Sequence, residues 1–235
     1  MTHEHRTVHR IVGVLEAVAR ADGRPVSLSA LTNQLETPKS TVHGFARGLV
    51  AEGYLEETPQ GYVLGNGLHA VLGPAESSVV LLLKDVCEEI AVRTGETVTI
   101  VVRVADSVIY VHTTPSVYEV CYVPKLRVRR PLLPTSGGKL FLALAPRQSD
   151  ATIAERFPAE VMDAYLAERE AIVASGVAYN RGETVPEVGA AAVGARIEGK
   201  IAAALSIAGP GPRVNDKLEY FGEIALTTLA DAGLA

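Results

Sequence analysis

Residues 38–47, Pro-Lys-Ser-Thr-Val-His-Gly-Phe-Ala-Arg, decide how the first third of the chain is interpreted. Thr37 precedes the proline and is therefore biased away from the helical region, so one helix must end before this run and a new one must start within it. The new helix is predicted from about Ser40 to Glu52, because its apolar side chains recur at helical spacing, at Val42, Phe45, Ala46 and Leu49.

The opposite face of this predicted helix carries polar side chains suited to DNA. In a helix-turn-helix the second helix of the motif enters the major groove. Residues three, four and seven positions apart share one face, and hydroxyl, imidazole and cationic groups can contact bases or phosphates. The predicted DNA-binding residues are Lys39, Ser40, Thr41, His43, Gly44 and Arg47. The alternative is a structural three-helix bundle whose polar face is only solvated.

Working outward, two helices precede this segment and a hairpin follows it. A first helix is predicted from the apolar stripe Val8, Ile11, Val12, Leu15 and Val18, and it ends at Asp22-Gly23. Ser27 can cap a second helix. Residues 54–57 and 61–64 are predicted to form two short strands joined across residues 58–60. Three helices and a hairpin predict a winged helix-turn-helix over residues 1–72.

A second domain is predicted over residues 96–235, joined by a linker helix within residues 73–95 that starts near Ala75. The residues expected on the buried side of that helix are Val79, Leu82, Leu83, Val86 and Ile90. Helices are predicted from Ser136 to Leu144, over 158–175 and from Asn215 towards Leu229. Hairpins are predicted for 98–104 with 108–112, for 119–123 with 126–130, and for 190–197 with 201–208. Strand pairs with a few helices indicate an antiparallel α+β domain.

Charge and composition narrow the function classes. The 235 residues include 22 basic and 27 acidic side chains, giving a net charge of −5, which argues against a protein that is basic all over and coats nucleic acid. The first fifty residues nevertheless hold six basic and four acidic side chains. No stretch approaches the ~20 apolar residues of a membrane span, and the first residues lack the apolar run of a signal peptide. A cytosolic protein is expected.

Several short runs resemble IclR-type bacterial transcriptional regulators across almost the whole chain. Residues 38–43, 53–55 and 61–65 resemble that family's DNA-binding domain, and residues 94–97, 136–143 and 203–210 its effector domain. The resemblance implies a winged helix-turn-helix, a linker helix and a GAF-like sheet domain that binds a small effector, with no cofactor. It also implies dimers, often paired into tetramers, on palindromic double-stranded operators. A repressor of a neighbouring catabolic operon is the expected role.

The expected effector pocket starts at Pro134-Thr135-Ser136-Gly137-Gly138-Lys139, where an apolar helix begins and its amides are available to an anion. The resemblance implies that this helix start receives the carboxylate of the effector. Because Ala208 replaces a small polar residue of the family, a roomier and less polar pocket is expected, suited to an aromatic acid or acyl compound. The implied effector-binding residues are Ser136, Gly137, Asn180, Gly189 and Ser206.

Two departures and two alternatives remain. Gly44 stands where the family commonly has a basic residue, which shifts phosphate contacts to Lys39 and Arg47. Ser136 and Lys139 satisfy the Ser-x-x-Lys spacing of serine acyl-enzymes, although the partner motifs of those enzymes are absent. The second alternative is a DNA-binding dimer whose C-terminal domain is purely structural. No metal site is predicted, since the histidines at 3, 5 and 9 have no completing ligands.

Overall fold

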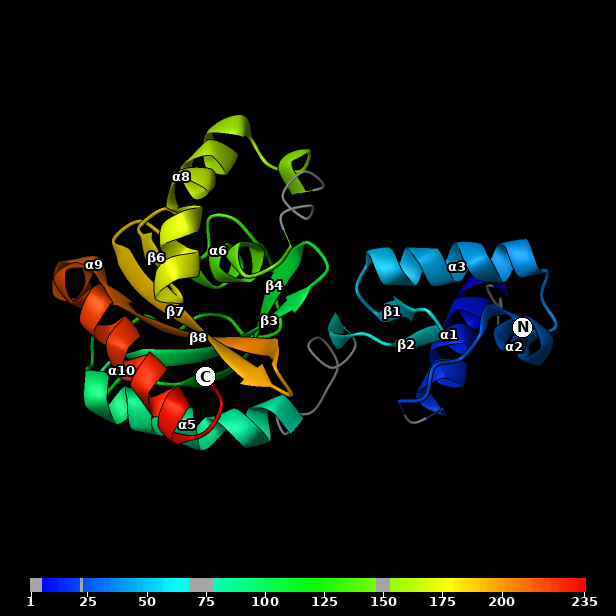
Figure 1. The fold of residues 1–235 in the computed structure, drawn as a ribbon, viewed down its shortest axis with the longest axis horizontal. Coiled ribbons are helices and arrows are strands. Elements are labelled where there is room, and N and C mark those ends of the chain that lie inside the picture. Colours follow the sequence, from blue (N-terminus) through cyan, green and yellow to red (C-terminus); the bar gives the residue numbers. More distant parts are fainter. Residues whose placement is uncertain (1–5, 22, 68–77, 147–152) are drawn as a thin grey trace. The chain divides into compact units, whose positions relative to one another are not determined.

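The computed structural model describes residues 6–21, 23–67, 78–146 and 153–235. The chain divides into two compact units, Met1–Leu72 and Gly73–Ala235 (Figure 1). The start predicted for the linker helix at Ala75, the helix end at Asp22, and His3 and His5 lie outside the described residues. In the described ranges no helix is long and apolar enough to cross a membrane.

The first unit is a helix-turn-helix with a two-stranded wing, as predicted. Its elements are α1 (Arg6–Ala19), α2 (Leu28–Leu35), α3 (Lys39–Ala51), β1 (Leu55–Thr58) and β2 (Gly61–Leu64). The predicted cap is confirmed, because the Ala30 amide donates to the Ser27 hydroxyl at 3.2 Å. The three helices and the wing share one core, formed by Val14, Ala17, Val18, Leu31, Val42, Ala46, Leu49, Leu55 and Tyr62.

The buried side of α1 differs from the predicted stripe. Val14, Ala17 and Val18 are buried, whereas Val8 and Val12 are 56% and 44% exposed. The spacing was helical, but α2, α3 and β2 cover only the C-terminal half of this apolar face. The wing is tied to the turn after α1, since Val26 and Tyr62 exchange two backbone hydrogen bonds of 2.9 Å.

The second unit is built on a six-stranded antiparallel sheet with the order β5-β4-β3-β8-β7-β6. The strands are β3 (Thr97–Val104), β4 (Ser107–Thr114), β5 (Arg129–Pro131), β6 (Val177–Arg181), β7 (Val188–Ile197) and β8 (Lys200–Pro210). The helices are α5 (Ser78–Thr94), α6 (Ser136–Ala143), α8 (Ala159–Ser175), α9 (Gly211–Val214) and α10 (Leu218–Asp231), with a 3-10 turn at Asn215–Lys217.

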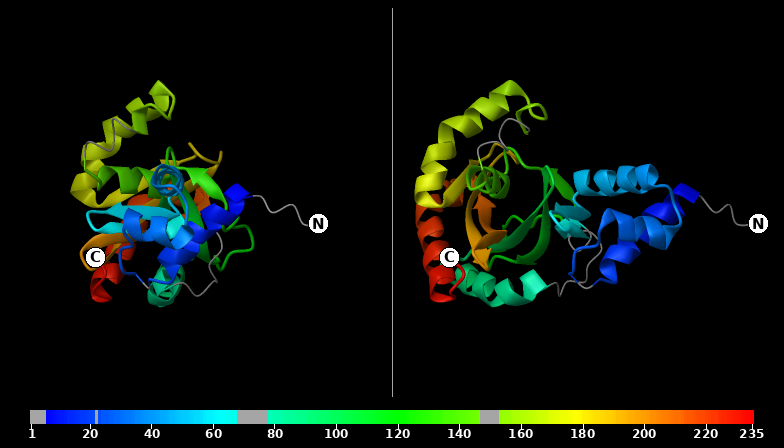
Figure 2. Two further views of the ribbon diagram at one scale, coloured as in Figure 1. Left: turned by 90° about the vertical axis from the view of Figure 1, so that its right-hand side faces the viewer. Right: turned by 45° about the vertical axis from the view of Figure 1, so that its right-hand side comes forward.

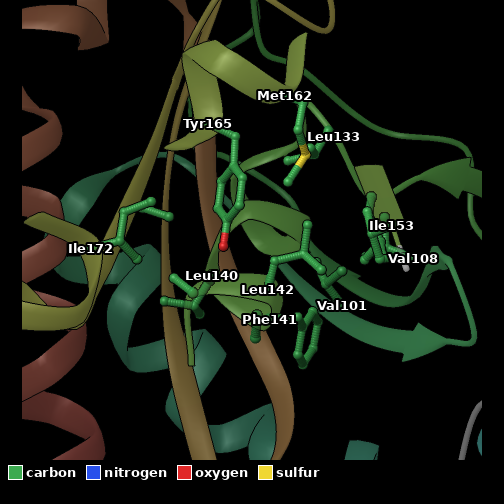
Figure 3. Packing of buried hydrophobic residues seen from close by; sticks show 14 residues of the cluster. Val101, Val108, Leu133, Leu140, Phe141, Leu142, Ile153, Met162, Tyr165 and Ile172 are labelled. Atoms are coloured by element: carbon green, nitrogen blue, oxygen red, sulfur yellow. The ribbon is translucent and has the colours of Figure 1, made fainter. Parts of the chain in front are cut away.

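Helices cover both faces of this sheet. Helices α5 and α10 pack together on one face, and α6 and α8 lie on the other (Figures 1 and 2). The hydrophobic core on this side includes Leu140 and Leu142 of α6 and Met162, Tyr165 and Ile172 of α8, seen at close range in Figure 3. The predicted antiparallel α+β class is confirmed.

Three local predictions in this unit are wrong. Residues 119–123 and 126–128 form no strand, and only Arg129–Pro131 joins the sheet. The alternating pattern there does not mark a buried face, because Val120 and Val123 are 72% and 59% exposed. Strand β6 was not predicted at all. Leu82, expected on the buried side of α5, is 46% exposed, while Cys87 takes a buried place.

The first turn of α6 is seated on the preceding backbone. A Cβ at Gly138 would lie 1.9 Å from the carbonyl oxygen of Leu132, so only glycine fits there. Thr135 caps the helix, accepting from the Gly138 amide at 3.1 Å and donating to Leu132 O at 2.6 Å. A Cβ at Gly137 would meet only the side chain of Val101, at 3.1 Å. The small residues at this helix start therefore serve packing.

These two adjacent glycines predict graded effects on stability. Gly138→Ala is expected to lower the free energy of unfolding of the second unit by about 3 kcal/mol, because a rigid carbonyl occupies the space. Gly137→Ala is the control and should cost about 1 kcal/mol, because the Val101 side chain can shift. Denaturant unfolding of the full chain measures both. Equal losses for the two variants would contradict this account of the α6 seat.

Candidate functional site

Helix α3 presents the predicted DNA-binding residues on its exposed face. Val42, Ala46 and Leu49 are buried against the first unit's core. Thr41 is half-buried, and the other five predicted DNA-binding residues are exposed: Lys39, Ser40, His43, Gly44 and Arg47. Five of the six predicted residues are thus accessible on α3 and Thr41 is partly so, while their contact with DNA stays a prediction.

The start of α3 and the neighbouring wing add features that suit a phosphate backbone. Pro38 provides no side-chain cap, so the first amides of the helix are available to an anion. Arg47 acts electrostatically on the wing: burial and the neighbouring Glu57 raise the pKa of Tyr62, and Arg47 acts to lower it.

Two glycines on α3 have no packing role. A Cβ at Gly44 or at Gly48 would meet nothing within 4 Å. Glycine inside a helix costs about 1 kcal/mol relative to alanine, so the fold alone gains nothing from either residue. A close approach of the helix backbone to another molecule would explain them.

A pocket in the second unit lies where α6, β6 and β8 meet. It is lined by Thr99, Tyr110, Tyr122, Thr135, Ser136, Asn180, Thr184, Val185, Val188, Ala190, Ser206 and Ala208. Eight of these twelve residues carry a hydroxyl or an amide. Three of the five residues implied for the effector site, Ser136, Asn180 and Ser206, are therefore brought together here.

Ser136 and Ser206 form the floor of this pocket. Their hydroxyl oxygens are 3.4 Å apart, and both side chains are buried. Thr135 is the cap of α6, so the Ser136 hydroxyl is not used to cap the helix. The amides of Ser136 and Gly137 donate to no acceptor within the described part of the chain. Two neighbouring hydroxyls thus lie at the start of a helix whose first two amides have no acceptor among the described residues.

Asn180 is held rigidly at the pocket wall. Its amide nitrogen donates to Pro134 O at 2.6 Å and to the Thr184 hydroxyl at 2.8 Å, and its oxygen accepts from the Gly182 amide at 3.2 Å. These bonds connect β6 to the residue just before the α6 cap. Asn180 is therefore a supporting residue of the α6 start as well as part of the lining.

Two of the residues implied for the effector site, Gly189 and Gly137, are not among the residues that line the pocket. Gly189 lies on the other face of β7, where a Cβ would meet Asn215 and Val214. Its neighbours Val188 and Ala190 face the pocket instead, as strand alternation requires. Gly137 faces Val101, so only its amide is available to a ligand. Gly189 is thus offset by one residue from the two positions of β7 that line the pocket.

Three polar lining residues were not predicted: Thr99 on β3, Tyr110 on β4 and Thr184 in the loop after β6. Tyr110 and Tyr122 contribute phenols, and burial together with the nearby Tyr122 raises the pKa of Tyr110 to about 12. Thr99 on β3 and Thr184 add hydroxyls. The space open to the centre of a water molecule is only about 30 Å³. The described pocket is therefore narrow, and the expectation of a roomier and less polar pocket than in binders of smaller acids stays a prediction.

Lys139 has a structural role. Its ammonium donates to Glu168 at 2.9 Å, to Glu183 at 2.8 Å and to Tyr179 O at 3.0 Å, so its three protons are all used. The hydroxyl of Ser136 faces Ser206 instead. The Ser-x-x-Lys arrangement of an acyl-enzyme is not formed. Among the described residues, no group of three His, Cys, Asp or Glu side chains is placed to hold a metal ion.

Comparison with known proteins assigns the family. Residues 76–232 match the model described as "Bacterial transcriptional regulator IclR C-terminal", and residues 7–59 match the "IclR helix-turn-helix domain". The chain belongs to the IclR family of transcriptional regulators. Its N-terminal unit is thus a DNA-binding domain and its C-terminal unit an effector-binding domain, and the matched families and relatives are regulators, not enzymes.

Relatives of this IclR-family chain include a probable HTH-type transcriptional regulator, ArcR, from Halobacterium salinarum. The two are 26% identical over 96% of this chain and 92% of ArcR. The regulator KdgR of Dickeya chrysanthemi is 27% identical over 60% of this chain, and the match spans 47% of KdgR, about half its length.

Solved structures of the family share the fold. An IclR-family regulator from Rhodococcus sp. has a TM-score of 0.61 at 26% identity, covering 97% of this chain and 92% of that one. An IclR homolog from Microbacterium hydrocarbonoxydans, solved with 4-hydroxybenzoate, has a TM-score of 0.60 at 21% identity, covering 97% and 99%.

Replacing Gly44 is expected to change stability and DNA affinity in opposite directions. Gly44→Ala should stabilise the first unit by about 0.5–1 kcal/mol, because the helix gains propensity and the Cβ has room. It should weaken DNA binding about threefold or more, since the added methyl group holds the backbone away from the groove. Thermal unfolding and a titration with DNA selected from a random pool measure the two effects.

The control for Gly44→Ala is Ser29→Ala, an exposed change on α2. It should also favour its helix but leave DNA affinity unchanged. If Gly44→Ala binds DNA as tightly as the parent, α3 does not approach the groove at this residue.

The Lys139 cluster predicts a pH dependence of stability. Burial alone would raise the pKa of Glu183, but hydrogen bonds from Lys139 and from backbone amides bring it below its ordinary value of 4.5. The carboxylate therefore stabilises the fold above that pH, and this contribution is lost as the pH falls below it. Glu183→Gln should lower the unfolding temperature at pH 7, and its difference from the parent should shrink below pH 4.5.

Glu223→Gln, an exposed change on α10, is the control and should show no such convergence with the parent. A Glu183→Gln deficit that stays constant from pH 7 to well below pH 4.5 would contradict the assigned role of the Lys139 bond.

Proposed function

We propose that this chain is an effector-responsive repressor that binds operator DNA through α3 and a small carboxylic acid through the α6 pocket. It acts in the cytosol as a homodimer or a pair of dimers. The observation that supports the ligand most strongly is the pair of buried hydroxyls of Ser136 and Ser206, 3.4 Å apart, at the start of α6, where the Ser136 and Gly137 amides have no acceptor among the described residues.

A carboxylate suits this arrangement for electrostatic reasons. The start of a helix carries a partial positive charge, and its first amides point towards the ligand. None of the twelve lining residues is Lys or Arg, so a single anionic group would be held by neutral donors and the helix end. Ser136 and Ser206 can donate to one carboxylate oxygen each, and the amides of Ser136 and Gly137 complete the set.

The remainder of the pocket favours an acid with a largely apolar body and a polar far end. Val185, Val188, Ala190 and Ala208 supply apolar contacts, while the phenols of Tyr110 and Tyr122 can hydrogen-bond a substituent. The 4-hydroxybenzoate bound by the Microbacterium homolog has this chemistry. Because the closed pocket is narrow, an aromatic body requires a wall to move outward.

In this proposal the effector acts by shifting an equilibrium. It binds better to the arrangement of the dimer in which the two DNA-binding units do not match the operator, and the preference is transmitted through α5. The controlled genes would lie next to this gene and encode breakdown of the acid. A purely structural second unit remains the competing account, and it makes the opposite prediction for ligand binding.

A ligand screen followed by a DNA-release assay tests the function. DNA selected from a random pool supplies the operator, and thermal shift with benzoate, 4-hydroxybenzoate, phenylacetate and pyruvate supplies the ligand. An acid present at a hundred times its dissociation constant should stabilise the second unit by ~2.7 kcal/mol and release the DNA. Ser206→Ala should weaken acid binding about fivefold, as loss of one hydrogen bond predicts.

The matched control is Ser175→Ala, because Ser175 bonds only within the α8–β6 junction. It should leave acid binding unchanged. Intact DNA binding with no stabilisation by any acid would favour a purely structural second unit. Unchanged affinity of Ser206→Ala for the acid would show that the acid does not bind in the α6 pocket.

A further inference from the structure

Residues 116–122, here called the Tyr122 segment, are fastened to the corner where α5 ends and β3 begins. The Ser116 hydroxyl donates to Gly95 O at 2.6 Å, and the Ser116 amide donates to the Thr97 hydroxyl at 3.2 Å. The Val117 amide donates to Gly95 O at 3.3 Å. The segment forms no strand, so its main chain depends on such contacts.

Arg213 strengthens this attachment through a buried carboxylate. Its guanidinium contacts Glu96 twice, with Nε to Oε1 at 2.6 Å and Nη2 to Oε2 at 2.8 Å. Glu96 is only 1% exposed, and this fork occupies both of its oxygens. A charge buried to this extent fixes the position of its partner, because separation would leave Glu96 unpaired in the interior.

The same guanidinium holds the Tyr122 segment from the other side. Arg213 Nη1 donates to Val120 O at 2.9 Å, and the guanidinium carbon lies 4.4 Å from the centre of the Tyr118 ring. The ring also packs on Gly95, where a Cβ would approach it to 3.0 Å. Arg213 therefore joins the segment to the α5–β3 corner through one carbonyl and one aromatic face.

Apolar burial does little to hold this segment. Val117 and Val120 are 75% and 72% exposed, and Tyr118 is 47% exposed. Two residues beyond Val120, the side chain of Tyr122 lines the effector pocket. The position of that pocket wall therefore depends on the polar contacts that Arg213 and Ser116 make between the segment and the α5–β3 corner. Neither residue lines the pocket.

We propose that Arg213 and Glu96 are positioning residues of the effector pocket: they hold the Tyr122 segment as a movable wall and connect its position to the end of α5. Ligand entry opens the wall, and a bound ligand that contacts Tyr122 favours the closed position. The part of this proposal that concerns ligand rests on the proposed function, whereas the control of the wall by Arg213 does not.

The absence of tryptophan from the chain permits a direct test in the full-length protein. Tyr122→Trp places one indole fluorophore on the wall. In that background, Arg213→Gln combined with Glu96→Gln removes both charges together, so no ion is left unpaired. Acrylamide should then quench the introduced indole about threefold more efficiently, and trypsin should cleave after the exposed Lys125 about tenfold faster, because local opening controls both.

Arg181 supplies the matched control. It also binds a carboxylate, Glu219, donates to a backbone carbonyl, Asn215 O, and lies over a tyrosine ring, Tyr179. It makes none of the contacts that hold the Tyr122 segment. Arg181→Gln combined with Glu219→Gln should leave indole quenching and Lys125 cleavage at the parent values. An effect as large as that of the Arg213 pair would show general loosening and overturn the proposal.

A second variant covers the case in which the double variant does not fold. Arg213→Lys keeps the charge beside Glu96 but loses the fork and the bond to Val120, so it should open the wall to a smaller extent. Parent values of quenching and cleavage in a folded Arg213 variant would overturn the proposal.

With 4-hydroxybenzoate as the probe, the introduced indole should be protected from quenching in the Tyr122→Trp parent, and the Arg213 variants should bind the acid about tenfold more weakly.

If 4-hydroxybenzoate and the other acids bind neither the parent nor the variants, the proposed function fails, and the quenching and cleavage measurements still decide the role of Arg213. If acid binding is normal in a variant whose wall is open, Arg213 does not position the pocket.

Discussion

The first turn of α6 rests on the carbonyl oxygen of Leu132, and this one contact organises the effector-binding unit. It admits only glycine at position 138, and Thr135 closes the turn by bonding both to Leu132 O and to the Gly138 amide. The Ser136 hydroxyl lies beside that of Ser206, and the Ser136 and Gly137 amides are left without an acceptor among the described residues. Asn180 fixes the same turn from β6 through Pro134 O. Packing and recognition are thus satisfied by different atoms of one short segment.

The DNA-binding unit shows the opposite relation between stability and function. At Gly44 and Gly48 of α3 the fold has room for side chains but the sequence has none, so helix propensity is given up on the exposed face. At the pocket, by contrast, the glycines are required by packing. The same residue type therefore carries different information in the two units, and only the surroundings of each glycine separate the two cases.

Local patterns in the sequence predicted the elements whose partners are close in the chain. The helix-turn-helix, the wing and the hairpins β3–β4 and β7–β8 follow from apolar spacing and turn residues. Strand β6 was missed, because it is short and its pairing with β7 is not marked by a tight turn. The prediction of a hairpin over residues 119–130 was wrong, because the local sequence does not show whether a partner strand is present. Thr99, Tyr110 and Thr184 could not be assigned to the pocket, since only the sheet register brings them near Ser136.

The proposed function places a carboxylate at the amides of Ser136 and Gly137. Amide resonances of the full-length, isotope-labelled protein, followed by NMR during titration with an acid that stabilises it, report on this contact residue by residue. The account predicts large, saturable shifts for Ser136 and Gly137, and a smaller one for Gly138, whose amide is already bonded to Thr135. Saturable binding of the acid that leaves the Ser136 and Gly137 amides unmoved would contradict it.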